Sequence, residues 1–245
     1  MGNMFCGYAC IVYAMRGELE TAAPFIGFAI VLDMLDGRIA RLTGTASDFG
    51  IQFDSMADVI SFGVAPAILA FQWGLSPLGR LGWLAGFMFV TAAAMRLARF
   101  NIQAAAGGDK RHFVGMPSPA AAAVPAATVY AYPYAFQDYR EALPVLVMVL
   151  VPAVLMVSTI RFRSFKTIDL QTRRPYTVLL LIALGIVLIA THPRSVLVVL
   201  AYSYLLSAFV GMAVARFRHR GEPIPPAESV GPQTIDDHHP RDARG

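Results

Sequence analysis

DMLDGRIARLTGTASDFGIQFDSMAD, residues 33–58, is the stretch that decides the fold of this chain. It carries two pairs of acidic residues, Asp33 with Asp36 and Asp54 with Asp58, and it lies between the apolar runs PFIGFAIVL and VISFGVAPAILAFQWG. A carboxylate inside a membrane-spanning helix costs several kcal/mol, roughly 2.5–3.5 on insertion scales. We therefore expect a bound cation, a water-filled cavity, or both to compensate these charges.

The spacing of these carboxylates predicts how they cooperate. Positions three or four apart share one face of a helix, so each acidic pair lies on one face. The segment between the pairs is rich in turn residues, namely Thr43, Gly44, Thr45, Ser47 and Gly50. The simplest geometry is two adjacent antiparallel helices that aim both pairs at one point near the turn. Oxygen ligands of this kind suit Mg²⁺, Mn²⁺ or Ca²⁺, and no His or Cys lies nearby to suggest zinc.

The fixed positions of this stretch resemble the signature of the CDP-alcohol phosphatidyltransferases. The matching pattern is Asp33-x-x-Asp36-Gly37-x-x-Ala40-Arg41, eight residues, and then Gly50-x-x-x-Asp54-x-x-x-Asp58. Three further segments are similar to the phosphatidylserine synthase branch of that family: MRLARFN at 95–101, FVGMPSPAAA at 113–122 and STIRFRSFK at 158–166. The resemblance covers about residues 2–220.

The resemblance implies a reaction and a set of residues for it. The phosphatidyl group of CDP-diacylglycerol would pass to the hydroxyl of L-serine, with CMP as the leaving group. A divalent metal, Mg²⁺ or Mn²⁺ with Ca²⁺ as a possible occupant, would be held by Asp33, Asp36, Asp54 and Asp58. Asp58 would also act as the general base. The donor would be bound by Asp36, Gly37, Arg41 and Ser47, although Gly37 could instead serve helix packing between small residues.

The serine site is less sharply indicated. L-Serine is zwitterionic, so its pocket needs a cation for the carboxylate. The candidates near the similar segments are Arg96, Arg99, Asn101, Arg111, Arg163 and Lys166. Each basic residue could instead anchor a span on the cytoplasmic side. Arg96 and Arg99 lie three apart on one helix face, which favours them as a pair.

Composition identifies an integral membrane protein. Of the 245 residues 56% are hydrophobic and 15% are charged, and the mean hydropathy is +0.56. In an average soluble protein roughly 45–50% of the residues are hydrophobic and about 25% are charged. The net charge of +4 does not indicate a nucleic-acid partner, because the basic residues punctuate apolar runs instead of forming a block. We predict an all-α bundle with about eight spans, near 2–15, 21–41, 48–73, 81–101, 113–134, 142–162, 176–191 and 195–215.

Residues 1–220 are predicted to form one transmembrane catalytic domain. Residues 221–245, rich in Pro, Gly and charge, are predicted to be a disordered cytoplasmic tail. The family resemblance also implies a Pro-Asn pair ahead of the first span, which this sequence lacks, and a homodimer, in keeping with the common two-fold symmetry of oligomers.

Two other functions remain open. The same donor chemistry could use glycerol phosphate, inositol phosphate or a simple alcohol as the acceptor. Intramembrane carboxylates also occur in cation transporters. Clustering of the carboxylates at one membrane face, and the lack of visible inverted repeats, disfavour transport.

Charge asymmetry gives a testable topology. One set of connections and ends holds fourteen Lys and Arg residues, and the alternate connections hold four, namely Arg16, Arg80, Arg140 and Arg194. By the positive-inside rule, both ends and the 33–58 turn face the cytoplasm of a cell-membrane protein. A reporter inserted after Gly44 should therefore read as cytoplasmic in whole cells. An external signal at Gly44 would overturn this topology.

Overall fold

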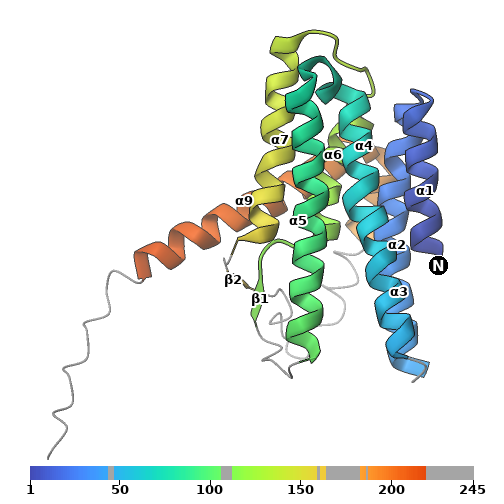
Figure 1. The fold of residues 1–245 in the computed structure, drawn as a ribbon, viewed down its shortest axis with the longest axis vertical. Helices are drawn as coiled ribbons and strands as arrows, with labels where there is room; N and C mark the ends of the chain where they lie inside the picture. Colours follow the sequence, from blue (N-terminus) through green and yellow to red (C-terminus); the bar gives the residue numbers. More distant parts are fainter. Residues whose placement is uncertain (44–46, 106–111, 159–160, 164–182, 186, 219–245) are drawn as a thin grey trace, which may run out of the picture.

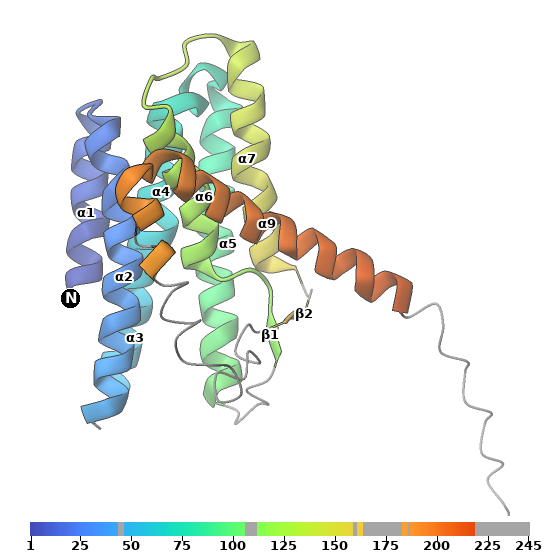
Figure 2. The same cartoon turned by 180° about the vertical axis from the view of Figure 1, so that it is seen from behind.

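The computed structural model describes residues 1–43, 47–105, 112–158, 161–163, 183–185 and 187–218. Within these ranges the chain is helical apart from one short pair of strands. Helices α1 to α7 stand side by side as a bundle, and α9 crosses the bundle obliquely (Figures 1 and 2). The predicted helical architecture is confirmed, and the strand pair is an addition that the sequence analysis did not include.

The first two helices form an antiparallel hairpin. Helix α1 spans Gly2–Met15 and α2 spans Leu19–Thr43. Between them Gly17 takes a φ of +79°, a left-handed conformation that glycine adopts without steric cost. The amide of Glu18 then bonds back to the carbonyl of Tyr13 at 3.0 Å, which closes the turn.

The second acidic pair lies at the start of a long helical column. The column begins as α3, Asp48–Val59, and continues through a π-helical turn η1, Ile60–Val64, α4, Ala65–Ala70, a second π-helical turn η2, Phe71–Leu75, and a 3₁₀ turn η3, Ser76–Leu78. The Oγ of Ser47 caps its first turn by accepting a hydrogen bond from the Gly50 amide at 3.1 Å.

The remaining helices pack around an alanine-rich centre. They are α5, Arg80–Ala105, α6, Ser118–Ala131, α7, Tyr139–Val157, and α9, Pro193–Arg218, and residues 183–185 and 187–191 are also helical. Helix α6 contacts α2, α4, α7 and α9. Its buried residues include Ala121, Ala122 and Ala126, whose small side chains let neighbouring helices approach closely.

A two-stranded antiparallel sheet joins the start of α6 to the end of α7. Strand β1, His112–Val114, pairs with β2, Arg161–Arg163. Two predicted spans are corrected here, because 113–134 begins as a helix only at Ser118 and 142–162 ends as one at Val157. The reason is local: Gly115 takes a φ of +88°, and the next amide bonds to the end of α7 instead of continuing a helix.

Three helical stretches of the described chain are long and apolar enough to cross a membrane. They are Phe49–Leu78, Arg80–Gln103 and Tyr139–Val157. The apolar stretches Gly2–Met15 and Pro193–Ser207 are shorter. The predicted span at 176–191 lies partly outside the described residues, as does the whole of the predicted tail at 221–245. The count of eight spans stays a prediction.

A close approach of α1 to the long column positions the site. A Cβ at Gly7 would lie 2.8 Å from the Cα of Ser61, so a glycine is needed for the observed helix separation. One turn earlier, the backbone carbonyl of Asn3 accepts a hydrogen bond from the Ser61 hydroxyl at 3.0 Å. The amino-terminal turn of α1 is thereby held against the helix that carries Asp54 and Asp58.

Candidate active site

Three carboxylates from two helices converge beside α1. Asp33 lies on α2, and Asp54 and Asp58 lie one turn apart on α3. One oxygen from each carboxylate lies within 4.8 Å of the others. Asp33 and Asp58 are half-buried, whereas Asp54 is exposed. The predicted meeting of the two helices near their turn is therefore present, with one carboxylate from the first helix and two from the second.

The charges of these groups demand compensation. Two unit charges 4.8 Å apart repel by about 3.5 kcal/mol at an effective dielectric constant of about 20. Three carboxylates this close are an unfavourable arrangement unless a cation or protons neutralise them. Carboxylate oxygens from different elements, meeting at one point with one of them open to solvent, fit a hard divalent cation such as Mg²⁺ or Mn²⁺. Asp33, Asp54 and Asp58 could hold that cation.

The fourth acidic residue lies at the edge of this cluster. Asp36 interacts electrostatically with Asp33 and Asp54, but it is not among the three carboxylates that meet within 4.8 Å. Its side chain is 47% exposed. In this arrangement Asp36 is a neighbour of the cluster and faces solvent.

The predicted donor residues follow at the end of α2 and the start of α3. Gly37 lies one position after Asp36 on a partly exposed part of α2. Arg41 belongs to the last turn of the same helix, and its side chain lies outside the described part of the structure. Ser47 is exposed and its hydroxyl accepts the Gly50 amide, so its observed contact is a helix cap.

Asn3 is a site residue that the sequence analysis missed. Its Nδ2 donates a 2.8 Å hydrogen bond to Oδ1 of Asp58. The residue is only 1% exposed, and among the described residues its Oδ1 has no hydrogen-bond partner. An amide buried in the apolar run GNMFCGYAC was the signal that could have found it. We had expected an amino-terminal contribution only from a Pro-Asn pair ahead of this position.

Arg96 is the predicted acceptor residue that faces the cluster. From α5, its guanidinium interacts electrostatically with Asp58 and with Tyr204 of α9. Its Nη1 donates to the Ser118 hydroxyl at 3.0 Å, at the first turn of α6. Its Nε is buried and has no hydrogen-bond partner within the described ranges. The side chain therefore ties α5 to α6, and its positive charge acts on Asp58 and Tyr204.

The other predicted acceptor residues are placed differently. Arg99 donates to the backbone carbonyl of Val157 at 3.1 Å, at the end of α7. Asn101 donates to the Ser55 hydroxyl at 2.8 Å and so ties α5 to α3. Arg163 lies in β2, and its side chain is outside the described part. Arg111 and Lys166 both lie outside the described residues.

Comparisons with known proteins identify the family of the chain. Residues 1–160 match the family model described as CDP-alcohol phosphatidyltransferase. A CDP-diacylglycerol–serine O-phosphatidyltransferase of Helicobacter pylori is 37% identical over 85% of this chain and 86% of its own length. The enzyme of the same name from Bacillus subtilis is 35% identical over 49% of this chain and 66% of its own. An archaetidylserine synthase of Methanothermobacter thermautotrophicus is 37% identical over 66% of each chain.

The contact between Asn3 and Asp58 predicts a role in ion affinity. A residue that orients a metal-binding carboxylate typically contributes 10–100-fold to metal affinity. Replacing Asn3 by Ala should therefore weaken Mn²⁺ binding by about 10–100-fold, measured by calorimetric titration of the purified protein in detergent. Thr91→Ala is the control, because within the described part of the chain the Thr91 hydroxyl bonds to the carbonyl of Phe87 on its own helix α5. Unchanged Mn²⁺ affinity in Asn3→Ala would contradict the proposed orienting contact.

Proposed function

The chain belongs to the CDP-alcohol phosphatidyltransferase family, and on that premise we propose that it transfers the phosphatidyl group of CDP-diacylglycerol to the hydroxyl of L-serine, giving phosphatidylserine and CMP. The observation that carries the proposal is the convergence of the Asp33, Asp54 and Asp58 oxygens within 4.8 Å, inside the family motif. Similarity to the serine-using enzyme of H. pylori along most of both chains supports serine as the acceptor.

The carboxylates supply the electrostatics of the reaction. Asp33, Asp54 and Asp58 would hold Mg²⁺ or Mn²⁺, with Asp36 at the edge, and Ca²⁺ is a possible occupant. A bound divalent cation supplies positive charge that offsets the pyrophosphate and the departing CMP. Gly37 would let the nucleotide approach the α2 backbone, and Arg41 and Ser47 would contact the donor phosphates.

Asp58 would receive the proton of the acceptor. Attack by the serine oxygen on the phosphorus of the phosphatidyl group forms the new P–O bond and breaks the bond to CMP. The proton leaves the serine hydroxyl for Asp58. Asn3 donates to Oδ1 of Asp58 and so restrains this carboxylate. Asn3 thereby favours one orientation of the base.

The acceptor would bind between Asp58 and α5. Arg96 faces Asp58 and keeps an unpartnered Nε among the described residues, so its guanidinium can hold the serine carboxylate. The side chains of Arg99 and Asn101 donate hydrogen bonds to Val157 and Ser55, so in this arrangement they would support the wall of the pocket. Arg111, Arg163 and Lys166 remain proposed contributors to serine binding.

The setting of the reaction is proposed on the same grounds. The chain would be a multi-pass protein of the cell membrane with eight spans, a site that faces the cytoplasm, and residues 221–245 as a disordered tail. It would act as a homodimer, since most oligomers of one chain are two-fold symmetric.

Product identification tests the proposed reaction. Purified protein with Mn²⁺ and CDP-diacylglycerol, offered serine, glycerol phosphate and inositol phosphate together, should yield phosphatidylserine and CMP by mass spectrometry. Asp58→Asn should lower kcat by 10²–10⁴-fold, the usual contribution of a general base. The exposed Asp138 at the start of α7 gives the control Asp138→Asn. A phosphatidyl product made from glycerol phosphate or inositol phosphate would show that serine is not the acceptor. Absence of CMP would reject the transferase activity.

Arg96 gives a second, more specific test. A hydrogen bond to a charged group contributes about 1.5–3 kcal/mol, which corresponds to roughly 10–150-fold in affinity. Arg96→Ala should therefore raise the KM for serine by at least about tenfold and change the KM for CDP-diacylglycerol much less. Arg99→Ala serves as the comparison. Equal KM changes for both substrates in Arg96→Ala would show that Arg96 stabilises the fold and does not bind serine.

A further inference from the structure

The entry to α6, residues 115–119, carries a buried hydroxyl that contacts the proposed acceptor site. Ser118 is the first residue of α6 and is only 2% exposed. Its Oγ accepts a 3.0 Å hydrogen bond from Nη1 of Arg96, which lies 22 positions earlier in the chain. We propose that Ser118 is a positioning residue of the acceptor site, which holds the Arg96 guanidinium where it can meet the carboxylate of L-serine. This proposal deepens the proposed function and rests on it.

The backbone around Ser118 is fixed by contacts that do not involve Arg96. Gly115 takes a φ of +88°, and the amide of Met116 donates to the carbonyl of Leu155 at 3.0 Å, near the end of α7. The side chain of Met116 is fully buried. Pro117 follows, and its ring restricts φ immediately before Ser118. The Ser118 hydroxyl is therefore held in place by the packing of this segment against α7.

Arg96 is the flexible partner of this hydrogen bond. An arginine side chain is long and has many rotamers, whereas its guanidinium is a rigid planar fork of donors. Nη1 donates to Ser118, and Nε has no hydrogen-bond partner among the described residues. One bond to a fixed hydroxyl thus restricts where the whole fork can lie, and Ser118 orients Arg96 more than Arg96 orients Ser118.

Asp58 attracts the same guanidinium in competition with Ser118. The charges of Arg96 and Asp58 act on one another. Within the described ranges, however, they form no ion pair, so their nitrogen and oxygen atoms lie more than 4.0 Å apart. The acceptor needs this separation, because its carboxylate must reach Arg96 while its hydroxyl reaches Asp58. The hydrogen bond to Ser118 opposes closure of the gap.

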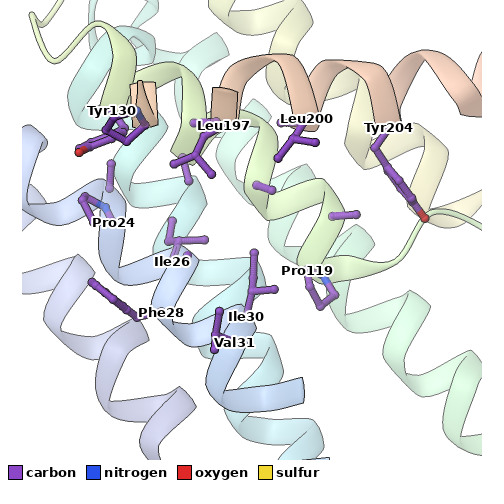
Figure 3. A pocket seen from close by; sticks show the side chains of 18 of the residues that line it. Pro24, Ile26, Phe28, Ile30, Val31, Pro119, Tyr130, Leu197, Leu200 and Tyr204 are labelled. Atoms are coloured by element: carbon purple, nitrogen blue, oxygen red, sulfur yellow. The ribbon is translucent and has the colours of Figure 1, made fainter. Parts of the chain in front are cut away.

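The surroundings of Ser118 are largely apolar. Its neighbours Pro117 and Pro119 line an apolar cavity between α2, α6 and α9, together with Tyr204, and Figure 3 shows Pro119 and Tyr204 near the same end of that cavity. Tyr204 interacts electrostatically with Arg96, but no hydrogen bond joins the two side chains in the described part of the protein. A buried donor that loses its acceptor is not compensated by water. Without the Ser118 hydroxyl, the guanidinium would therefore turn toward Asp58.

Removing the hydroxyl tests the proposal. In Ser118→Ala the KM for L-serine should rise about threefold to tenfold, the range expected for one hydrogen bond. The KM for CDP-diacylglycerol should stay within about twofold, because the two substrates do not share this contact. Ser118→Thr retains the hydroxyl and should keep the KM for L-serine within about twofold of the starting protein. Elution volume and thermal midpoint in detergent show whether each variant is folded.

A double-mutant cycle separates positioning from direct binding. Introduced into Arg96→Ala, Ser118→Ala should change the KM for L-serine by less than about twofold, because a residue that acts through Arg96 then has nothing left to position. Thr128→Ala is the matched control: it also removes a hydroxyl from α6, one that bonds to the Val124 carbonyl and the Tyr202 hydroxyl. Its KM for L-serine should stay within about twofold.

An unchanged KM for L-serine in a folded Ser118→Ala would overturn the positioning role. An equal rise in both KM values would also overturn it, since the hydroxyl would then serve the fold. An undiminished effect in the Arg96→Ala background would show that Ser118 acts independently of Arg96, which is a third way for the proposal to fail. Failure of the proposed function is recognised separately, either because the starting protein releases no CMP or because Arg96→Ala alone leaves the KM for L-serine unchanged. Either result removes the premise and this proposal with it.

Discussion

Three like-charged carboxylates held within 4.8 Å of one another are the constraint around which this structure is arranged. Their repulsion, at least about 3.5 kcal/mol for each ionised pair at an effective dielectric constant of about 20, opposes the approach of Asp33 on α2 to the two carboxylates of α3. Neutral contacts from α1 hold the arrangement from one side, since Asn3 donates to Asp58 and Gly7 lets α1 lie close to Ser61 on the same helical column. The remaining compensation must come from a cation or from protons at the carboxylates.

Positive charge of the protein itself enters from the opposite side. The charge of Arg96 on α5 acts electrostatically on Asp58, and its guanidinium donates to Ser118 at the start of α6. A buried guanidinium is tolerated where opposite charge and hydrogen-bond acceptors surround it. Tyr204 of α9 interacts electrostatically with Arg96 and also lines an apolar cavity between α2, α6 and α9.

Helix geometry explains which of the acidic residues meet in the cluster. Asp54 and Asp58 are four positions apart, a rotation of about 40° on a helix, so one face carries both. Asp33 and Asp36 are three positions apart, so their side chains are rotated by about 60° in the opposite direction around the helix axis. With Asp33 turned toward α3, Asp36 is left at the edge of the cluster. Spacing alone did not tell which of the two would face inward.

The sequence by itself determined the helical class, the family motif and the oxygen-rich site at one turn, because apolar run length and helical period are properties of single segments. Only the tertiary structure decided that Asn3 meets Asp58 across 55 positions. It likewise decided that Arg96 and not Arg99 faces the cluster, and that β1 and β2 replace helix at the ends of two spans. The physical reason is that periodicity reports the faces of one helix, whereas the meeting of faces depends on how closely separate segments can pack.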